Sequence, residues 1–428
     1  MHGDSQPSPG QALSGQAATL DACLDAVRAW EPAIDAWTFL PGRDAFPSGD
    51  MDGPLAGVPF GVKDVIDVHG MPTGLGWDAL PAPLHPDADA AVVAALRGAG
   101  AVPLGKTRST AFAFTDPTDT RNPWDPARTP GGSSSGSGAA VGAGTVPFAL
   151  GTQTAGSLCR PAAFCGGWAW KPGLGVLPAD GMCPLSESFD AIGVIARDWC
   201  WLDRVYRVLA DAFGLAHPVG VVRPMRIGRV TVPGQTPVGA MVGALDTVAR
   251  AATAAGHVVA TVIPDVAFTD LVEWHRRIML AEAVHNIARF TGGATDCLPP
   301  RLKAGLEEGA TLDPAQVAEA RQKVAAARAA FWRAMRGFDM LLACPVPGAA
   351  PVGLQTTGDQ SYLTPWTVLG GPLVTLPAGL DDDGMPLGAL LAAAPGNDGP
   401  LMGMAAALAR VLPALPRPRL PSGLSPSA

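Results

Sequence analysis

The sequence predicts a single α/β domain built on a large mixed β-sheet. Segments with helical periodicity alternate with strand-like segments to the end of the chain, and neither an internal repeat nor a polar linker divides it. The 428 residues are 48% hydrophobic and only 16% charged. This composition supplies enough apolar material for one large core and argues against a disordered chain. We therefore expect one domain over residues 1–428.

The predicted elements begin with a helix over 20–30, where apolar residues recur at helical spacing. A strand is expected over 57–67, a helix over 88–97 that ends at Gly98, and a short strand over 101–104. The rest of the chain continues this alternation, with strands over 226–232, 258–263, 338–343, 373–378 and 386–392, and helices over 240–255, 271–289 and 314–335.

One region departs from the alternation because nearly every residue in it is small. Residues 129–144 read TPGGSSSGSGAAVGAG, and residues 151–167 read GTQTAGSLCRPAAFCGG. Such segments let a backbone approach another backbone or a ligand closely, at an entropic cost that folding alone does not favour. A flexible linker is the alternative, but the apolar run PFAL at 147–150 and the bulkier residues near 160 interrupt it. The region is therefore predicted to have a function.

Charge and cysteine content exclude several classes of partner. The net charge is −8 with no block of Lys or Arg, which argues against nucleic acid and anionic membranes. The N-terminus has no signal-peptide pattern and no stretch is long and apolar enough to span a bilayer, so a cytoplasmic protein is expected. The seven cysteines are scattered without metal-ligand spacing. We expect neither a metal nor a cofactor, and the sequence leaves a homodimer open.

Two short motifs match known patterns in a context that does not fit them. Residues 100–107 satisfy GxxxxGK[ST], a phosphate-binding loop, but the four middle residues are apolar, include a proline and resemble a strand. Residues 132–136 fit GxSxG, the nucleophile elbow, but three prolines precede them where a strand is needed. A nucleotide-binding protein that depends on Lys106 stays as the alternative from another functional class.

Ser157 has the setting that a serine nucleophile requires. A strand-like apolar run leads into GTQTAGS at 151–157, and a helix is expected to follow from Pro161. Successive backbone N–H groups are then expected to form an oxyanion hole, those of Thr154, Ala155, Gly156 and Ser157. The hydroxyl also needs a base, and a lysine serves if burial lowers its pKa toward neutrality. Lys63, within an apolar segment, is the best candidate.

The chain resembles the amidase signature family at these motifs. The matching segments are GVPFGVKD at 57–64, PGGSS at 130–134, GTQTAGS at 151–157 and RPAAFCG at 160–166. The resemblance continues to the last predicted strands. It implies one α/β/α domain around a mixed sheet, with a catalytic core over about 55–200 and a variable, substrate-shaping region over about 210–310.

The resemblance also implies roles for individual residues. Ser157 is the nucleophile, Ser133 after a non-prolyl cis peptide is the bridging serine, and Lys63 is the base of a Ser–cis-Ser–Lys triad. This triad hydrolyses a small amide through an acyl-enzyme. We also expect Ser134 and Thr152 to contact the substrate. The remaining matching residues, which are Asp190, Arg197, Lys106 and Lys171, are interpreted as non-catalytic.

The position of Arg160 bears on which substrate the chain would take. Many family members have arginine two residues after the nucleophile, whereas here it lies three residues after, a spacing similar to that of malonamidase-like members. Their arginine is implied to bind a substrate carboxylate, so a small acidic monoamide is predicted, with malonamate first. The alternative is a structural Arg160 paired to an internal acid. An amidase for aryl amides, carbamates or ureas stays open, as does the glutaminase component of a tRNA amidotransferase.

Overall fold

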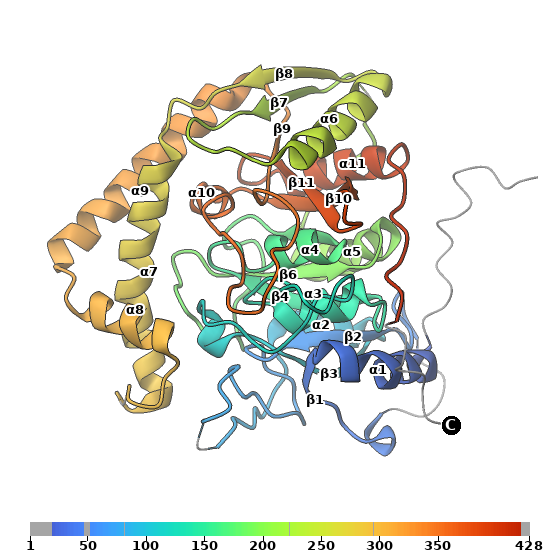
Figure 1. Cartoon of the computed structure of the whole chain (residues 1–428), viewed down its shortest axis with the longest axis vertical. Coiled ribbons are helices and arrows are strands. Elements are labelled where there is room, and N and C mark those ends of the chain that lie inside the picture. Colours follow the sequence, from blue (N-terminus) through green and yellow to red (C-terminus); the bar gives the residue numbers. More distant parts are fainter. Residues whose placement is uncertain (1–18, 47–51, 81, 222, 294, 421–428) are drawn as a thin grey trace, which may run out of the picture.

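The computed structural model describes residues 19–46, 52–80, 82–221, 223–293 and 295–420. In these residues eleven strands form one mixed sheet, in the spatial order β1-β3-β2-β4-β6-β5-β10-β11-β9-β7-β8 (Figure 1). The predicted α/β domain with a large mixed sheet is confirmed. The strands are β1 (Trp37–Phe39), β2 (Pro59–Lys63), β3 (Val102–Thr107), β4 (Phe148–Gln153), β5 (Trp168–Lys171), β6 (Ala191–Ala196), β7 (Arg226–Val230), β8 (Val258–Val262), β9 (Met340–Ala343), β10 (Leu373–Leu380) and β11 (Pro386–Ala392).

Parallel and antiparallel pairs are combined in this sheet. Strand β2 runs parallel to both β3 and β4, and β7 runs parallel to both β8 and β9. The other neighbouring strands pair antiparallel. The helices among the described residues are α1 (Leu20–Ile34), α2 (Ala91–Gly98), α3 (Ser135–Gly142), α4 (Cys159–Cys165), α5 (Trp199–Phe213), α6 (Gly239–Ala254), α7 (Phe268–Thr291), α8 (Pro300–Ala310), α9 (Pro314–Ala334), α10 (Thr364–Val368) and α11 (Asp398–Ala409).

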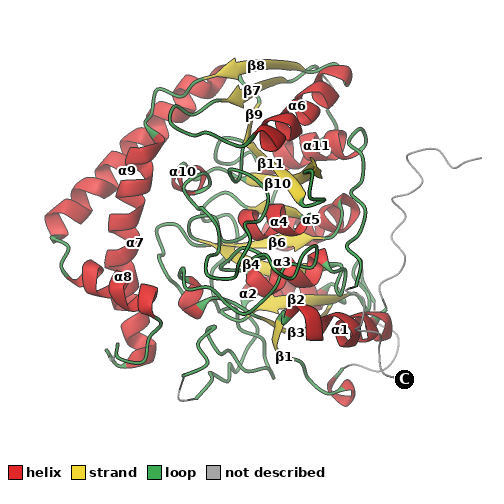
Figure 2. Cartoon of the chain, viewed as in Figure 1, coloured by secondary structure: helices red, strands yellow, loops and turns green. Residues whose placement is uncertain are grey.

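Helices cover both faces of the sheet, which explains why its central strands are buried throughout (Figure 2). In β4, Phe148 and Leu150 pack into the core that holds the apolar residues of α2, α5 and α11. Ala149, which points the other way, belongs to the core that holds residues of α1 and α3. The chain therefore builds α/β/α layers around β4, the strand that leads into the small-residue segment 154–157.

Helices α7, α8 and α9 form an arm beside the sheet, at the left of Figure 1. Leu271 and Ile278 of α7 share a core with Trp366 of α10. Further along the arm, Leu302 of α8 packs with Phe112, which precedes the small-residue region in sequence. The arm therefore lies against loops of the segment predicted to be the catalytic core.

Most predicted strands differ from the structure by one or two residues at an end, and the strands expected over 57–67 and 101–104 differ most. The strand expected over 57–67 ends at Lys63, because the Asp64 carboxylate and carbonyl accept hydrogen bonds from Gly74 N (3.1 Å) and Leu75 N (2.9 Å) and turn the chain. The strand expected over 101–104 continues to Thr107, since it pairs with both β1 and β2. Residues 102–107 are thus a buried strand, and the phosphate-loop pattern has no loop to bind phosphate.

Candidate active site

Lys63 and Ser133 lie in contact at the end of β2. Lys63 Nζ donates to Ser133 Oγ (2.6 Å) and to Thr152 Oγ1 (2.7 Å), and all three residues are buried. Burial lowers the pKa of Lys63 to about 7, and the Asp190 carboxylate partly opposes this shift. The structure therefore brings the predicted base into contact with the predicted bridging serine, and a pKa of about 7 leaves about half of this amine neutral at pH 7. The Thr152 side chain, expected at the substrate, contacts this lysine.

The backbone around Ser133 is closely surrounded. The Gly132–Ser133 peptide bond is cis, as the family resemblance predicts. The Ser133 carbonyl accepts from Thr110 N (3.2 Å), and the Gly132 carbonyl accepts from Arg160 Nη2 (2.6 Å). A Cβ at Gly132 would lie 2.6 Å from Thr357 Cγ2, so a larger residue does not fit there. Small residues in this segment thus allow a close approach of several backbones.

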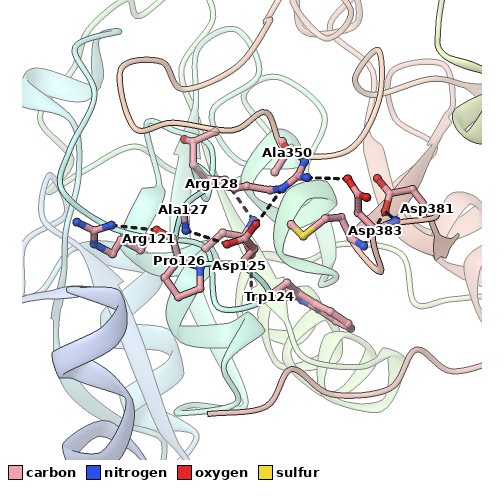
Figure 3. Close-up of polar contacts among 12 residues, drawn as sticks. Arg121, Trp124, Asp125, Pro126, Ala127, Arg128, Ala350, Asp381 and Asp383 are labelled. Atoms are coloured by element: carbon pink, nitrogen blue, oxygen red, sulfur yellow. Dashed lines mark hydrogen bonds and ion pairs between the residues drawn. The ribbon is translucent and has the colours of Figure 1, made fainter. Parts of the chain in front are cut away.

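The segment that leads to Ser133 is fixed by Arg128 (Figure 3). The Arg128 guanidinium donates to Asp125 Oδ2 (3.1 Å), to the Ala350 carbonyl (2.9 Å) and to Asp383 Oδ2 (2.8 Å). Gly353 N also donates to the Ala127 carbonyl (2.8 Å). These contacts join the 125–128 turn to the loop near 350 and to the turn between β10 and β11. The loop that leads to Ser133 is therefore fixed in place by these contacts.

Ser157 ends a loop whose amide groups are free. Within the described residues, no acceptor is found for the N–H groups of Thr154, Ala155, Gly156 or Ser157, the four predicted to form an oxyanion hole. The Ser157 hydroxyl likewise makes no hydrogen bond to another described residue. The segments of the two serines meet through Ser134 N, which donates to the Ser157 carbonyl (3.1 Å).

The carbonyl groups of the same loop, in contrast, are all engaged. The Thr154 carbonyl lies 2.8 Å from His275 Nε2, Thr367 Oγ1 donates to the Ala155 carbonyl (2.5 Å), and Arg160 N donates to the Gly156 carbonyl (3.0 Å). In a trans peptide unit the N–H points opposite to the carbonyl. The N–H groups of Ala155, Gly156 and Ser157 therefore point away from these partners.

Gln153 fixes the start and end of this loop. Its side-chain carbonyl accepts from Leu158 N (3.1 Å) and Cys159 N (3.0 Å), and its amide donates to Thr367 Oγ1 (3.0 Å). The uncharged Gln153 side chain thus accepts hydrogen bonds from backbone N–H groups at the start of α4. The sequence gives no signal for this role, because one of the partners, Thr367, lies 214 positions away.

Arg160 is buried beneath the loop and has spare donors. Its Nη2 donates to the Gly132 carbonyl and to Thr357 Oγ1 (3.2 Å), whereas Nε and Nη1 have no partner among the described residues. No described carboxylate forms an ion pair with it, although Asp359 is near enough to oppose the dominant effect of burial, which lowers the pKa of Arg160 to about 10. Arg160 therefore supports the backbone next to Ser133, and its Nε and Nη1 atoms have no acceptor among the described residues.

Ser134 is taken up by the backbone of β4. Its hydroxyl accepts from Thr152 N (3.2 Å) and donates to the Thr152 carbonyl (3.3 Å), and the side chain is fully buried. It lies just before α3, without a preceding strand. The GxSxG pattern therefore forms no strand–turn–helix elbow. The expected contact between Ser134 and substrate stays a prediction.

Comparison with known proteins places the chain among amide-cleaving enzymes. The family model described as Amidase matches residues 16–402. This chain belongs to the amidase signature family. The A subunit of glutamyl-tRNA(Gln) amidotransferase from Anaeromyxobacter dehalogenans is 32% identical over 96% of this chain and 92% of its own length. Its counterpart from Chloroflexus aurantiacus is 35% identical, over 64% of this chain and 62% of that protein. A crystal structure of an amidase superposes with a TM-score of 0.80 at 28% identity, over 92% of this chain and 95% of that one.

In this amidase, Asp190 connects the loop at 154–157 to the arm. Its carboxylate accepts from Thr154 Oγ1 (2.5 Å) and from the N–H groups of Leu185 and Ser186 (2.8 Å each). Burial raises the pKa of Asp190 to about 6, against the effect of these hydrogen bonds. The loop at 185–188 is in turn bound by Glu282 of α7. Asp190 thus acts as a structural support in the geometry observed.

Two further lysines of the amidase are buried for structural reasons. Lys106 Nζ forms an ion pair with Asp64 (3.4 Å) and donates to Thr73 Oγ1 (2.8 Å). Lys171 Nζ donates to the Pro172 carbonyl (2.5 Å), and burial lowers its pKa to about 8. Neither amine contacts a hydroxyl of the predicted triad.

The described part of the amidase contains no group of three or more His, Cys, Asp or Glu side chains that is arranged to hold a metal ion. None of its described helices is long and apolar enough to cross a membrane.

Proposed function

We propose that this amidohydrolase cleaves a small carboxamide through an acyl-enzyme on Ser157. The observation that carries the proposal is the contact between the Lys63 amine, whose pKa is lowered by burial to about 7, and Ser133 Oγ. This contact lies next to a loop in which four N–H groups have no acceptor among the described residues. In the neutral amine, Nζ–H donates to Thr152 Oγ1, and the lone pair accepts from the Ser133 hydroxyl. The pair thereby becomes a base.

The proposed reaction moves one proton along this relay. As Ser157 Oγ attacks the amide carbon, its proton passes to Ser133 Oγ and the Ser133 proton passes to Lys63. The N–H groups of 154–157 stabilise the oxyanion. The relay then runs backwards and protonates the leaving nitrogen, the C–N bond breaks, and water hydrolyses the ester on Ser157. Contacts at catalytic groups commonly tighten when substrate binds, which fits the absence of a Ser157–Ser133 hydrogen bond in the described residues.

Glutamine is the first substrate that we propose. The support is that the tRNA amidotransferase A subunit from Anaeromyxobacter dehalogenans matches 96% of this chain, and such relatives favour glutamine over malonamate as the substrate. Under this proposal the ammonia would be passed to a partner in a complex. The second candidate, malonamate, is supported by the spacing of Arg160 and by its two unpaired donors, which suit a substrate carboxylate.

A panel of amides tests both candidates. Glutamine, malonamate, benzamide, a carbamate and a urea are offered to the purified chain, and ammonia release is measured. Hydroxylamine is added in parallel, because an acyl-enzyme transfers its acyl group to form a hydroxamate. We expect hydroxamate from the preferred amide, and none with Ser157→Ala. If Arg160→Leu leaves the preference for carboxylate-bearing amides unchanged, the malonamate candidate is wrong.

A further inference from the structure

His275 of α7 contacts the loop at 154–157, although the two lie far apart in sequence. The side chain is 3% exposed, and Nε2 lies 2.8 Å from the Thr154 carbonyl. A carbonyl oxygen only accepts hydrogen bonds, so Nε2 carries the proton. Burial lowers the pKa of His275 to about 4, and the imidazole is therefore neutral in the range where Lys63 is a base.

Both the carbonyl and the side-chain hydroxyl of Thr154 make hydrogen bonds. His275 binds its carbonyl, and Asp190 binds its hydroxyl at 2.5 Å. The ring of Phe189, next to Asp190 in sequence, packs on the imidazole with centroids 4.6 Å apart. The imidazole thus has one orientation, set by the Phe189 ring and by the carbonyl. Helix packing alone does not explain why this buried donor faces the Thr154 carbonyl.

The consequence concerns the next amide along the chain. Thr154 C=O and Ala155 N–H belong to one trans peptide unit and point in opposite directions. A carbonyl fixed toward His275 therefore fixes the Ala155 N–H toward the other side, where it has no acceptor among the described residues. If this peptide rotated, the hole would lose a donor and gain a carbonyl, which repels an oxyanion.

We propose that His275 is a positioning residue that holds the Ala155 N–H toward the oxyanion formed on Ser157. The inference rests on the proposed function, since it assigns a role within that reaction. Thr367 holds the following peptide in the same way, from α10. Two helices outside the predicted catalytic core thereby set the direction of two donors.

The test compares three variants of α7. His275→Leu removes the donor and keeps an apolar side chain of similar size, whereas His275→Gln retains an N–H in reach of the carbonyl. His285→Leu is the matched control, because His285 lies exposed on the same helix and bonds only within it. Thermal unfolding of each variant verifies folding.

The readouts separate positioning from structure. Benzeneboronic acid forms a tetrahedral adduct on an active serine, whereas benzoate binds as a planar carboxylate. We expect His275→Leu to lose about 10- to 100-fold in boronate affinity and in the rate of Ser157 labelling by a fluorophosphonate, a loss that reflects a weakened donor. Benzoate affinity stays within about twofold, His275→Gln recovers most of the loss, and His285→Leu behaves like the wild type.

Contrary results would overturn the inference. Equal losses of boronate and benzoate affinity, or a His275→Gln variant no better than His275→Leu, would show a purely structural role. Normal labelling of His275→Leu would do the same while leaving the proposed function intact. A wild-type chain that takes no label at Ser157 would instead refute the proposed function itself.

Discussion

Lys63 Nζ contacts Ser133 Oγ at 2.6 Å although seventy positions separate the two residues in sequence. Strand β2 ends at Lys63, and the anchored loop that follows Arg128 brings Ser133 to it. Arginine would not serve at position 63, because its guanidinium stays protonated in proteins. A base at the end of β2 would therefore require lysine rather than arginine.

Ser133→Ala removes the middle of the proton relay. We expect kcat to fall by about 10²- to 10⁴-fold, the range of general acid–base catalysis, with KM little changed. Ser135→Ala is the matched control: its hydroxyl is buried two residues away and has no hydrogen-bond partner among the described residues. Steady-state ammonia release measures both variants. Equal activity of the Ser133 and Ser135 variants would rule out the bridging role.

The pH profile of kcat/KM is expected to follow the protonation of Lys63. Only the neutral amine accepts a proton, and its pKa lies at about 7. Activity is therefore expected to be half-maximal near pH 7 and to fall about tenfold per pH unit at more acidic pH. Lys171→Met, which removes another buried lysine, keeps this midpoint. A profile that is flat from about pH 5 to 8 would contradict a lysine base.

Lys63→Met changes how stability depends on pH. The pKa of Lys63 is about 7 in the folded chain and near 10.5 when unfolded, so between these values the unfolded chain binds more protons. The free energy of unfolding of the wild type gains up to about 1.4 kcal/mol per pH unit there from this group. Lys63→Met lacks this gain. The free energy of unfolding of the variant, measured by denaturant titration, is therefore expected to fall relative to that of the wild type from about pH 7 to pH 10. A constant difference would show that Lys63 is charged in the fold.

Lys106→Met leaves Asp64 buried without its ion-pair partner. Burial lowers the pKa of Lys106 and raises the pKa of Asp64, and their mutual attraction opposes both shifts. Loss of one partner of a buried pair costs about 3–5 kcal/mol of unfolding free energy. Adding Asp64→Asn is expected to recover part of this loss in denaturant titrations. If the losses of unfolding free energy from the two substitutions are additive, the two residues do not interact.

Binding of ATP by the wild type would support the nucleotide-binding alternative.

The sequence predicted local features better than long-range ones. Lys63 was recognisable because a lysine stands in an apolar run, and the loop at 154–157 because its residues are small and follow a strand. Strand β6 was not predicted, since Gly193 weakens the strand pattern. The structure shows why glycine is there: a Cβ would lie 2.5 Å from the Trp170 carbonyl of β5.

The hydrogen bonds that hold the loop at 154–157 could not be predicted, for a different reason. His275 lies 121 positions from Thr154, and Gln153 lies 214 positions from Thr367. Each residue taken alone fits ordinary helix or strand packing. Only the folded chain shows that their hydrogen bonds meet at one loop, because the order of strands in the sheet decides which distant segments become neighbours.

Mass-spectrometric mapping of the serine labelled by a fluorophosphonate tests the account most directly. We predict one adduct on Ser157 in the wild type and in Lys171→Met, formed at similar rates. Lys63→Met, which lacks the base, is predicted to label at least about 100-fold more slowly. An adduct on Ser134, or a Lys63→Met variant that labels as fast as the wild type, would contradict a Ser157–Ser133–Lys63 triad.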